Sequence, residues 1–360
     1  MTSKSAAFSA LRQARLLKDD TLLRCNVGPF QIAAVRSTNL QYVASSRWKW
    51  PENEHRRAWS ACSNANLLIA SFLSGEERVR ARMTMGDKYI GATEAIALGE
   101  VRGSFELGVG AATAAPHVGN DDTSAIQLTV ERILYGAAQP FSSSVTVPLS
   151  SALHDVQRTQ LAYQEYLDLS VQEQCSRILL FTGTERNDGE EKEKEGEEHK
   201  EWSGGLMVSS LGHYGMNAEL DDTVLVDAKE KDTIDEFSEW WDKEFVIGTT
   251  SSSSTPAGSS FMELSSQVGV VGALETMLSS SPLASFELKD VRVRSCDYYC
   301  RCTTDQFRKQ MKMLPVSELV SIMNDMNSSD GSEPLDLICH HCNEKHPLTY
   351  NDLELLLTSS

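Results

Sequence analysis

The sequence predicts an α+β fold: an N-terminal domain with helices and a mixed or mostly antiparallel sheet, then a helical linker, then a small C-terminal module that contains four paired cysteines. Strand-like and helix-like patterns mix along the chain without the regular alternation of strand and helix that is typical of a parallel sheet. Two polar inserts interrupt these patterns, and five of the eight cysteines lie in the last fifth of the 360 residues.

Composition limits the partners that the chain can have. Hydrophobic residues make up 41% of it, enough for a proper core, and the net charge is −18. We expect no nucleic-acid partner, because phosphate binding needs Lys and Arg gathered on one face. We expect no membrane partner either, since no apolar run approaches the ~20 residues that span a bilayer.

Residues 1–18 differ from the rest, with four basic residues, three serines, several leucines and no acid. This composition fits either a flexible tail or an organellar transit peptide, and the chain shows no apolar segment typical of a secretory signal. We therefore expect a cytoplasmic protein, or a mitochondrial or plastid one if the segment is a transit peptide. In such reducing compartments, cysteines serve as metal ligands or redox groups more often than as structural disulfides.

Residues 19–215 are predicted to form the α+β domain. A helix should begin near Asn53, because apolar residues recur every three or four positions up to Phe72 and Gly75 follows as a stop. In "ERVRARMTM" every second residue from Val79 is apolar, which predicts a half-buried strand. A second helix is expected over 150–174. Further strands are expected in "AIQLTVERILYG", "SVTVPL", "RILLFT" and "GGLMVSSLG".

Two inserts are predicted to lie outside the packed elements. The insert over 186–201 contains the charge run "DGEEKEKEGEEHKE", which has no apolar residue and predicts a solvated loop between two strands. The segment 249–260 is rich in serine and is typical of a flexible linker.

The segment 216–290 is predicted to be a metastable helical linker that contains the serine-rich insert. Its two apolar helical stripes are Ile234, Phe237, Trp240, Trp241 and Phe245, and Phe261, Leu264, Val268, Val271, Leu274 and Leu278. Gly269 and Gly272 interrupt the second stripe, and a glycine inside a helix costs ~1 kcal/mol relative to alanine. Alanine at either position should therefore make this helix more stable. Such helices depend on docking, which is either ordinary core packing or conditional on the segments that flank them.

The C-terminal module, residues 291–360, carries its cysteines in two close pairs, Cys300 with Cys302 and Cys339 with Cys342. Two such pairs are typical of a tetrahedral zinc site with four sulfur ligands. A module of 70 residues also needs a stabilising cross-link or a bound metal. Zinc held by thiolates supplies ~10–16 kcal/mol of folding free energy, and disulfides are the alternative way to stabilise the module.

The 36 residues between the two pairs are predicted to form a helical hairpin, with one short helix ended by Pro315 and a second capped by Ser317. The inward-facing residues should be Phe307, Met311, Leu314, Leu319, Val320, Ile322 and Met323. Three histidines are near enough to compete as ligands, although we expect them to face solvent: His340, His341 and His346. Three scattered cysteines are expected to be buried and inert: Cys25, Cys62 and Cys175.

The motifs resemble those of a known family. A C-x-C pair, "MLP", "SELVSIMNDM", a C-x-x-C pair and "NDLELL" follow one another as in the C-terminal redox switch of the heat shock protein 33 family. Upstream, "DDTLLRC", "GEVRG", "GGLMVSSL" and "LKDVRVR" are similar to other parts of that family, so the resemblance covers nearly the whole chain from about Asp19. The family comprises redox-regulated, ATP-independent holdase chaperones.

The resemblance implies that Cys300, Cys302, Cys339 and Cys342 bind one zinc ion per reduced chain. Oxidation would form Cys300–Cys302 and Cys339–Cys342 disulfides, release the metal and unfold the module. The linker would then leave the surface that binds unfolded or oxidatively damaged clients. The apolar linker residues involved would be Phe237, Trp240, Trp241, Phe245, Phe261 and Leu264. The family also implies a homodimer on activation and transfer of clients to a 70-kDa chaperone system.

The sequence departs from the family in three places. Cys296 is an extra thiol that could resolve an oxidised Cys300 as an accessory group. The spacer between the pairs is longer at "NSSDGSEPL", and the two inserts lengthen the domain and the linker. Two other functions compete with the chaperone. One is a constitutive zinc-dependent adaptor. The other is a thiol enzyme, which we do not expect because no C-x-x-C lies at a helix start in a thioredoxin-like unit.

Overall fold

The computed structural model describes residues 20–50, 53–85, 89–107, 125–148, 153–169, 176–184, 201–210, 228–246, 256–328 and 334–358. The N-terminal segment 1–18, the acidic insert up to residue 200 and Cys175 lie outside these ranges, so the predictions made for them stay predictions.

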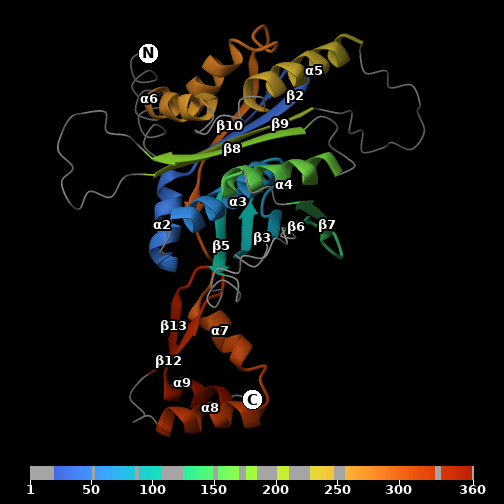
Figure 1. Cartoon of the computed structure of the whole chain (residues 1–360). Helices are drawn as coiled ribbons and strands as arrows, with labels where there is room; N and C mark the ends of the chain where they lie inside the picture. The colour runs from blue at the N-terminus through green and yellow to red at the C-terminus, as the bar shows by residue number, and fades with distance from the viewer. Residues whose placement is uncertain are drawn as a thin grey trace, which may run out of the picture.

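A five-stranded antiparallel sheet lies in the middle of the molecule, with the strand order β10-β1-β2-β9-β8 among the described residues (Figure 1). The strand β10 comes from late in the chain and crosses the boundary that we placed between residues 290 and 291. The last residue of the acidic insert, Glu201, begins β9. The strands are β1 (Thr21–Val27), β2 (Phe30–Arg36), β8 (Ser176–Thr184), β9 (Glu201–Ser210) and β10 (Leu288–Ser295).

A second sheet has the order β11-β5-β4-β3-β6-β7, and its strands pair antiparallel except that β11 joins β5 in parallel. In β3, Val79 and every second residue after it are buried, which confirms the predicted half-buried strand. The strands are β3 (Arg78–Met85), β4 (Tyr89–Ile96), β5 (Glu100–Leu107), β6 (Ala125–Ile133), β7 (Phe141–Pro148) and β11 (Asp297–Tyr298). The mostly antiparallel α+β prediction is confirmed.

Helices α3 (Asn53–Ala70) and α4 (Asp155–Leu169) lie between the two sheets, with α2 (Thr38–Trp48) beside them (Figure 1). The start of α3 at Asn53 is as predicted, and α4 is a shorter form of the helix expected over 150–174. Small residues on α3, such as Ala58, Ala61 and Ala65, are fully buried. They let the helix approach both sheets closely, so one apolar cluster fills the space between them.

The linker helices cover the other face of the five-stranded sheet (Figure 1). They are α5 (Ala228–Trp241), which continues as a π-helical turn (Asp242–Val246), and α6 (Pro256–Leu278). Residues 256–260 therefore begin α6 and are not part of a flexible linker; only 249–255 lie outside the described residues. No helix in the described ranges is both long and apolar enough to cross a bilayer.

The second linker stripe is not continuous, because α6 is kinked at Gly269 (φ 80°, ψ 165°). Before the kink Phe261 is buried, but Val268 is 44% exposed, contrary to the prediction. After the kink the buried face shifts to Val270, Ala273, Leu274 and Leu278. The backbone at Gly269 occupies a region that is open almost only to glycine. The expectation that alanine there makes the helix firmer is therefore wrong.

The distal part of the C-terminal module forms a small lobe of its own, at the bottom of Figure 1. Its elements are α7 (Thr304–Met311), α8 (Val316–Ser328), β12 (Leu335–Ile338), β13 (Lys345–Leu348) and α9 (Tyr350–Thr358). Leu319 and Met323 face inward as predicted, but Val320 is 41% exposed because the buried face of α8 continues along Met323 and Met326. Ser317 lies inside the first turn of α8 and does not precede the helix.

The kink predicts opposite effects for the two linker glycines. Gly269→Ala should lower the free energy of unfolding of α6 by about 1–3 kcal/mol, because it forces alanine into a glycine-only region. At Gly272, which has helical backbone, an added Cβ meets the exposed Val268 side chain at 3.0 Å, and that side chain can move. Gly272→Ala should therefore be neutral or stabilising by up to ~1 kcal/mol. Hydrogen exchange of α6 amides measures both, and equal protection in the two variants would contradict the assignment.

Candidate metal and redox site

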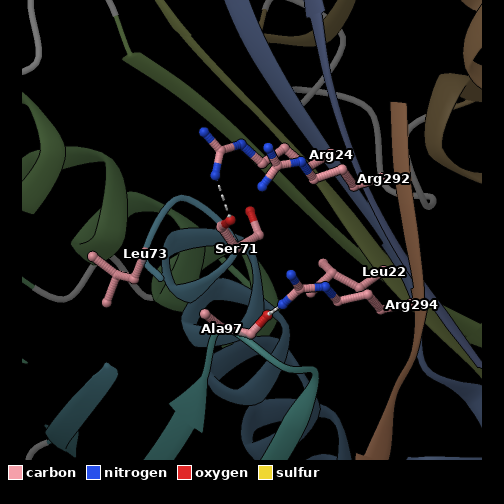
Figure 2. A pocket seen from close by; sticks show the side chains of 7 residues that line it. All are labelled: Leu22, Arg24, Ser71, Leu73, Ala97, Arg292 and Arg294. Carbon is pink, nitrogen blue, oxygen red and sulfur yellow. Dashed lines mark hydrogen bonds between the residues drawn. The ribbon is translucent and has the colours of Figure 1, made fainter. Parts of the chain in front are cut away.

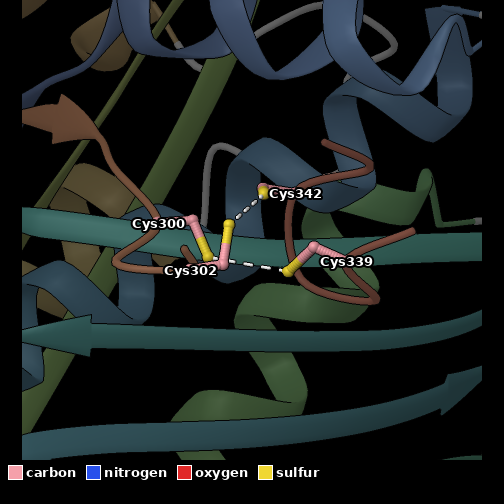
Figure 3. Close-up of side chains that lie close together, drawn as sticks. All are labelled: Cys300, Cys302, Cys339 and Cys342. Carbon is pink, nitrogen blue, oxygen red and sulfur yellow. Dashed lines mark hydrogen bonds between the residues drawn. The ribbon is translucent and has the colours of Figure 1, made fainter. Parts of the chain in front are cut away.

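The four paired cysteines meet at one point. Cys300 and Cys302 follow β11, while Cys339 and Cys342 lie in the turn between β12 and β13 (Figure 3). All four sulfur atoms lie within 4.8 Å of one another. The closest recorded approaches are 3.8 Å between Cys300 Sγ and Cys339 Sγ and 3.4 Å between Cys302 Sγ and Cys342 Sγ.

This spacing fits a tetrahedral metal site. A metal–sulfur distance of ~2.3 Å places the four sulfurs of a tetrahedron roughly 3.8 Å apart. The second pair is presented by a tight turn, in which the backbone N–H groups of Cys342 and Asn343 donate to the carbonyl of Cys339. Asn343 takes the left-handed conformation that closes such a turn (φ 57°). The residues present could therefore hold a metal ion without rearrangement.

The charge balance of the site also favours a cation. Without metal, the pKa of Cys300 is lowered to about 4, chiefly because Cys342 donates to its sulfur, with a contribution from Arg102. Burial raises the pKa of Cys302 to about 12, and the neighbouring Cys300 thiolate raises the pKa of Cys342. The Cys300 thiolate therefore opposes ionisation of Cys302 and Cys342. Four thiolates at this spacing need a cation between them, since metal ligands must be deprotonated.

Arg102 on β5 links the sulfur cluster to the core domain. Its Nη1 approaches Cys300 Sγ at 3.6 Å, while its Nη2 donates to Glu94 at 2.7 Å. Glu94 is only 5% exposed and also pairs with Arg80 and Arg78. A buried carboxylate that accepts several charge-assisted hydrogen bonds holds its partners in place, so the guanidinium of Arg102 is fixed against the sulfur.

His346 is the main correction to the predicted histidines. We expected it to face solvent, but it is 6% exposed and its Nε2 lies 3.2 Å from Cys302 Sγ. Its ring packs on Phe307 at 4.6 Å, and its Nδ1 contacts Thr304. The ring thus orients the sulfur from outside the four-sulfur group. No spacing pattern along the chain predicts this contact, because it joins β13 to α7. His340 is exposed as expected, and His341 is partly buried.

Cys296 does not join the cluster of described metal-ligand candidates. Its side chain is 4% exposed, and burial together with Asp20 and Asp297 raises its pKa well above the usual value. A buried thiol of this kind is a poor nucleophile, so an accessory role requires that the module first moves. Cys25 and Cys62 are buried, with pKa values raised by burial.

The sulfur cluster is docked on the core domain through the strip Gly99–Gly103, the "GEVRG" motif. Backbone N–H groups of Asp297 and Tyr299 donate to carbonyls of Gly99 and Val101, both within 3.1 Å. From the other side, the N–H of Gly103 donates to the carbonyl of His341 at 3.0 Å. Both cysteine pairs are therefore tied by backbone hydrogen bonds to the same edge of the same sheet.

Tyr298 closes this interface. Its hydroxyl contacts the carbonyls of Gly103 and His341 at 3.2 and 3.0 Å and accepts a hydrogen bond from Trp48 Nε1 at 3.0 Å. Arg301 adds ion pairs to Glu76 and Glu100 at the surface. Exposed pairs of this kind contribute little, so the buried tyrosine and the backbone bonds carry the docking.

The predicted linker residues pack against the five-stranded sheet. Trp241, Phe237, Phe245 and Phe261 are each at most 3% exposed, while Trp240 and Leu264 are partly buried. The ring of Phe237 lies 4.7 Å from that of Phe30 on β2, and the ring of Phe261 lies 5.7 Å from that of Phe181 on β8. Aromatic pairs at such distances contribute ~0.5–1.5 kcal/mol beyond their burial.

The docking geometry predicts the effect of removing one oxygen. Tyr298→Phe should weaken docking of the module by about 1–3 kcal/mol, because buried polar groups lose a partner. Metal should be retained, because no sulfur changes. The matched control is Tyr299→Phe, since Tyr299 is 52% exposed. Hydrogen exchange at residues 297–303 reports the docking, and equal exchange in the two variants would contradict the role of Tyr298.

Comparison with known proteins gives two findings and one absence. A structure of the 33 kDa chaperonin (heat shock protein 33 homolog) from Thermotoga maritima is similar with a TM-score of 0.62 at 16% identity, covering 94% of this chain and 98% of that one. At this identity the similarity shows the fold. A search of curated proteins gives no match. The family model for Hsp33 proteins matches residues 21–349, which span both sheets, the linker helices and all four clustered cysteines. The chain therefore belongs to the Hsp33 family of chaperones.

Proposed function

We propose that this chain is a redox-regulated, ATP-independent holdase that binds unfolding proteins after its clustered thiols are oxidised. The observation that carries the proposal is the position of the four sulfurs, which lie where the core domain, the distal lobe and the end of β10 meet. A chemical change at the sulfurs acts on all three. The proposed clients are unfolded or oxidatively damaged proteins, with a homodimer on activation and hand-over to a 70-kDa chaperone system.

Cys300, Cys302, Cys339 and Cys342 would hold one zinc ion per reduced chain. When bound, zinc supplies folding free energy of ~10–16 kcal/mol in small thiolate modules. The distal lobe needs it, because the described part of its own buried cluster contains six residues: Met311, Leu319, Met323, Met326, Leu348 and Leu353. Without the sulfur site, this lobe has too little apolar surface to offset the entropy of ordering its chain.

A peroxide is the proposed oxidant. For each disulfide, two thiols give up two electrons and two protons, and one molecule of hydrogen peroxide takes them up and is reduced to two molecules of water. The family pairing, Cys300 with Cys302 and Cys339 with Cys342, stays a prediction. A disulfide holds its two sulfurs ~2.05 Å apart, whereas the four unbonded sulfurs here are spread over distances of up to 4.8 Å. The turn at 339–343 then moves, and with it the carbonyl of His341 that holds Gly103.

Release of the linker would expose the client-binding surface. The outer face of the five-stranded sheet carries fully buried apolar residues, among them Leu23, Phe30 and Ile32, which α5 and α6 cover. An uncovered patch of this kind binds other apolar surfaces. For the compartment we propose the cytoplasm, or an organelle if residues 1–18 act as a transit peptide.

The metal assignment predicts that reduced protein contains one zinc per chain. Replacing any clustered cysteine by serine, for example Cys339→Ser, should remove a ligand and lower zinc retention sharply. Cys296→Ser should keep the metal, since that sulfur lies outside the four-sulfur group. Metal analysis after dialysis against a chelator measures both variants. Normal zinc content in Cys339→Ser, or zinc loss in Cys296→Ser, would show that the ligand set is wrong.

The holdase proposal predicts that peroxide-treated protein, and not reduced protein, suppresses light scattering by an aggregating client. Trp241→Ala should make the reduced, zinc-loaded protein partly active, because deleting this buried side chain costs about 3–5 kcal/mol of linker packing. Tyr135→Ala is the control, since Tyr135 is 67% exposed and lies away from the linker.

Activity that is equal before and after oxidation would favour the constitutive adaptor. If reduced Trp241→Ala protein does not suppress light scattering, and peroxide activates it normally, then the linker does not cover the client-binding surface.

A further inference from the structure

Three arginine side chains gather at a hollow between the edge of the five-stranded sheet and the turns below it (Figure 2). Arg24 lies on β1, and Arg292 and Arg294 lie on β10. Arg24 and Arg292 are direct partners across the two strands, and Arg294 faces Leu22 two residues along. Because side chains alternate along a strand, all three guanidinium groups lie on the same face.

Among the residues that the structure describes, these positive charges have no acidic side chain in contact. In the part of the chain that the structure describes, none of the three arginines forms an ion pair. Asp290 acts on Arg24 only from a distance, and its carboxylate accepts a hydrogen bond from Asn26 at 2.9 Å. Burial, Arg292 and Arg294 together lower the pKa of Arg24. Like charges directly opposite each other destabilise a strand pair, and here they occur in a chain of net charge −18.

Neutral groups hold two of the arginines in place. Arg24 donates to the carbonyl of Ser71 at 3.1 Å and lies over the ring of Phe72 at 5.5 Å. Arg294 donates to the carbonyl of Ala97. A guanidinium has five N–H donors, so each keeps donors for another acceptor. The hollow is small and open to solvent, and about 20 Å³ of it is accessible to the centre of a water-sized sphere.

We propose that this hollow binds a phosphoryl oxyanion, either free phosphate or the phosphate end of a nucleotide. Arginine forks match the oxygens of a phosphate in pairs, and two or three of them make a strong site without any other acid or base. The hollow is too small to enclose a nucleotide, so a phosphoryl group would bind at its open side against the arginines, and the rest of a larger ligand would lie in solvent. An anion seated there would also remove the repulsion between Arg24 and Arg292.

The site has a consequence for the switch, which rests on the proposed function. Strand β10 connects α6 of the linker to Cys296 and the sulfur cluster. An anion that bridges Arg24 and Arg292 ties β10 to β1 and so favours the docked, inactive form. A ligand that binds only this form, at ten times its dissociation constant, lowers the undocked population about elevenfold. Phosphate should therefore slow activation by peroxide.

The binding test uses reduced, zinc-loaded full-length protein and compares inorganic phosphate with chloride at equal ionic strength. We expect a saturable rise in Tm with phosphate, which Arg292→Gln abolishes and Arg82→Gln, at an exposed arginine on β3, retains. In chloride alone, Arg292→Gln should not lower Tm, because it removes a repulsion and breaks no ion pair. A phosphate effect that is absent, or equal in wild type and Arg292→Gln, would overturn the site.

A second arm separates the sources of the anion and the link to the switch. An equal effect of phosphate and ATP at the same concentration identifies free phosphate as the ligand, and a larger effect of ATP that Arg292→Gln abolishes identifies the nucleotide. The rate of peroxide activation, followed by client light scattering, should fall with ligand in wild type only. Binding without this change would contradict the link to the switch. Binding by a protein that never becomes a holdase would contradict the proposed function and leave the site intact.

Discussion

The fold of the C-terminal part depends on four sulfur atoms that lie within 4.8 Å of one another. Cys339 and Cys342 pack with the apolar cluster of the core domain, whereas the distal lobe has a separate cluster of its own. The sulfur site is therefore not the centre of an independent module; it is the joint between two apolar clusters. If the four sulfurs hold a metal ion as we propose, the site would form or break as a unit, and the contacts on both sides of it would form or break with it.

The interface around the joint consists mostly of backbone atoms. The carbonyl of His341 accepts from Gly103 and from Tyr298, and β11 pairs with β5 through its own N–H groups. Hydrogen bonds between backbone atoms require that two chain segments keep a fixed separation. Under the proposed function, a turn deformed by new sulfur–sulfur bonds would lose these backbone hydrogen bonds, although no interface side chain would have changed. In this proposal, oxidation of a few sulfur atoms would change how the domains dock.

Much of this arrangement could be predicted from the sequence, and the exceptions have physical causes. Side-chain patterns gave the alternation of β3, the start of α3, the aromatic stripe of α5 and the two cysteine pairs. The contact of β11 with β5 was missed because it spans two residues and depends on the backbone, which leaves no pattern. The burial of His346 depends on the packing of α7 against β13. At Gly269, apolar residues on both sides gave the appearance of one continuous helix, and the pattern cannot report a backbone angle.

Strand β10, an edge strand, connects α6 to the sulfur site, so the proposed coupling between the two would pass through it. Most of its residues are exposed or partly exposed, its register with β1 shifts between Arg24 and Asn26, and Asp290 has a left-handed backbone (φ 50°). Such irregularities, together with the facing arginines, lower the stability of the β1–β10 pairing. By contrast, α5 buries Phe237 and Trp241 almost completely. The packing of α5 on the sheet is therefore tight, whereas β10, which leads to the sulfur site, is bound to the sheet more weakly. If the sulfur site is lost as we propose, we expect β10 to detach first and the kinked α6 next to it to follow before α5.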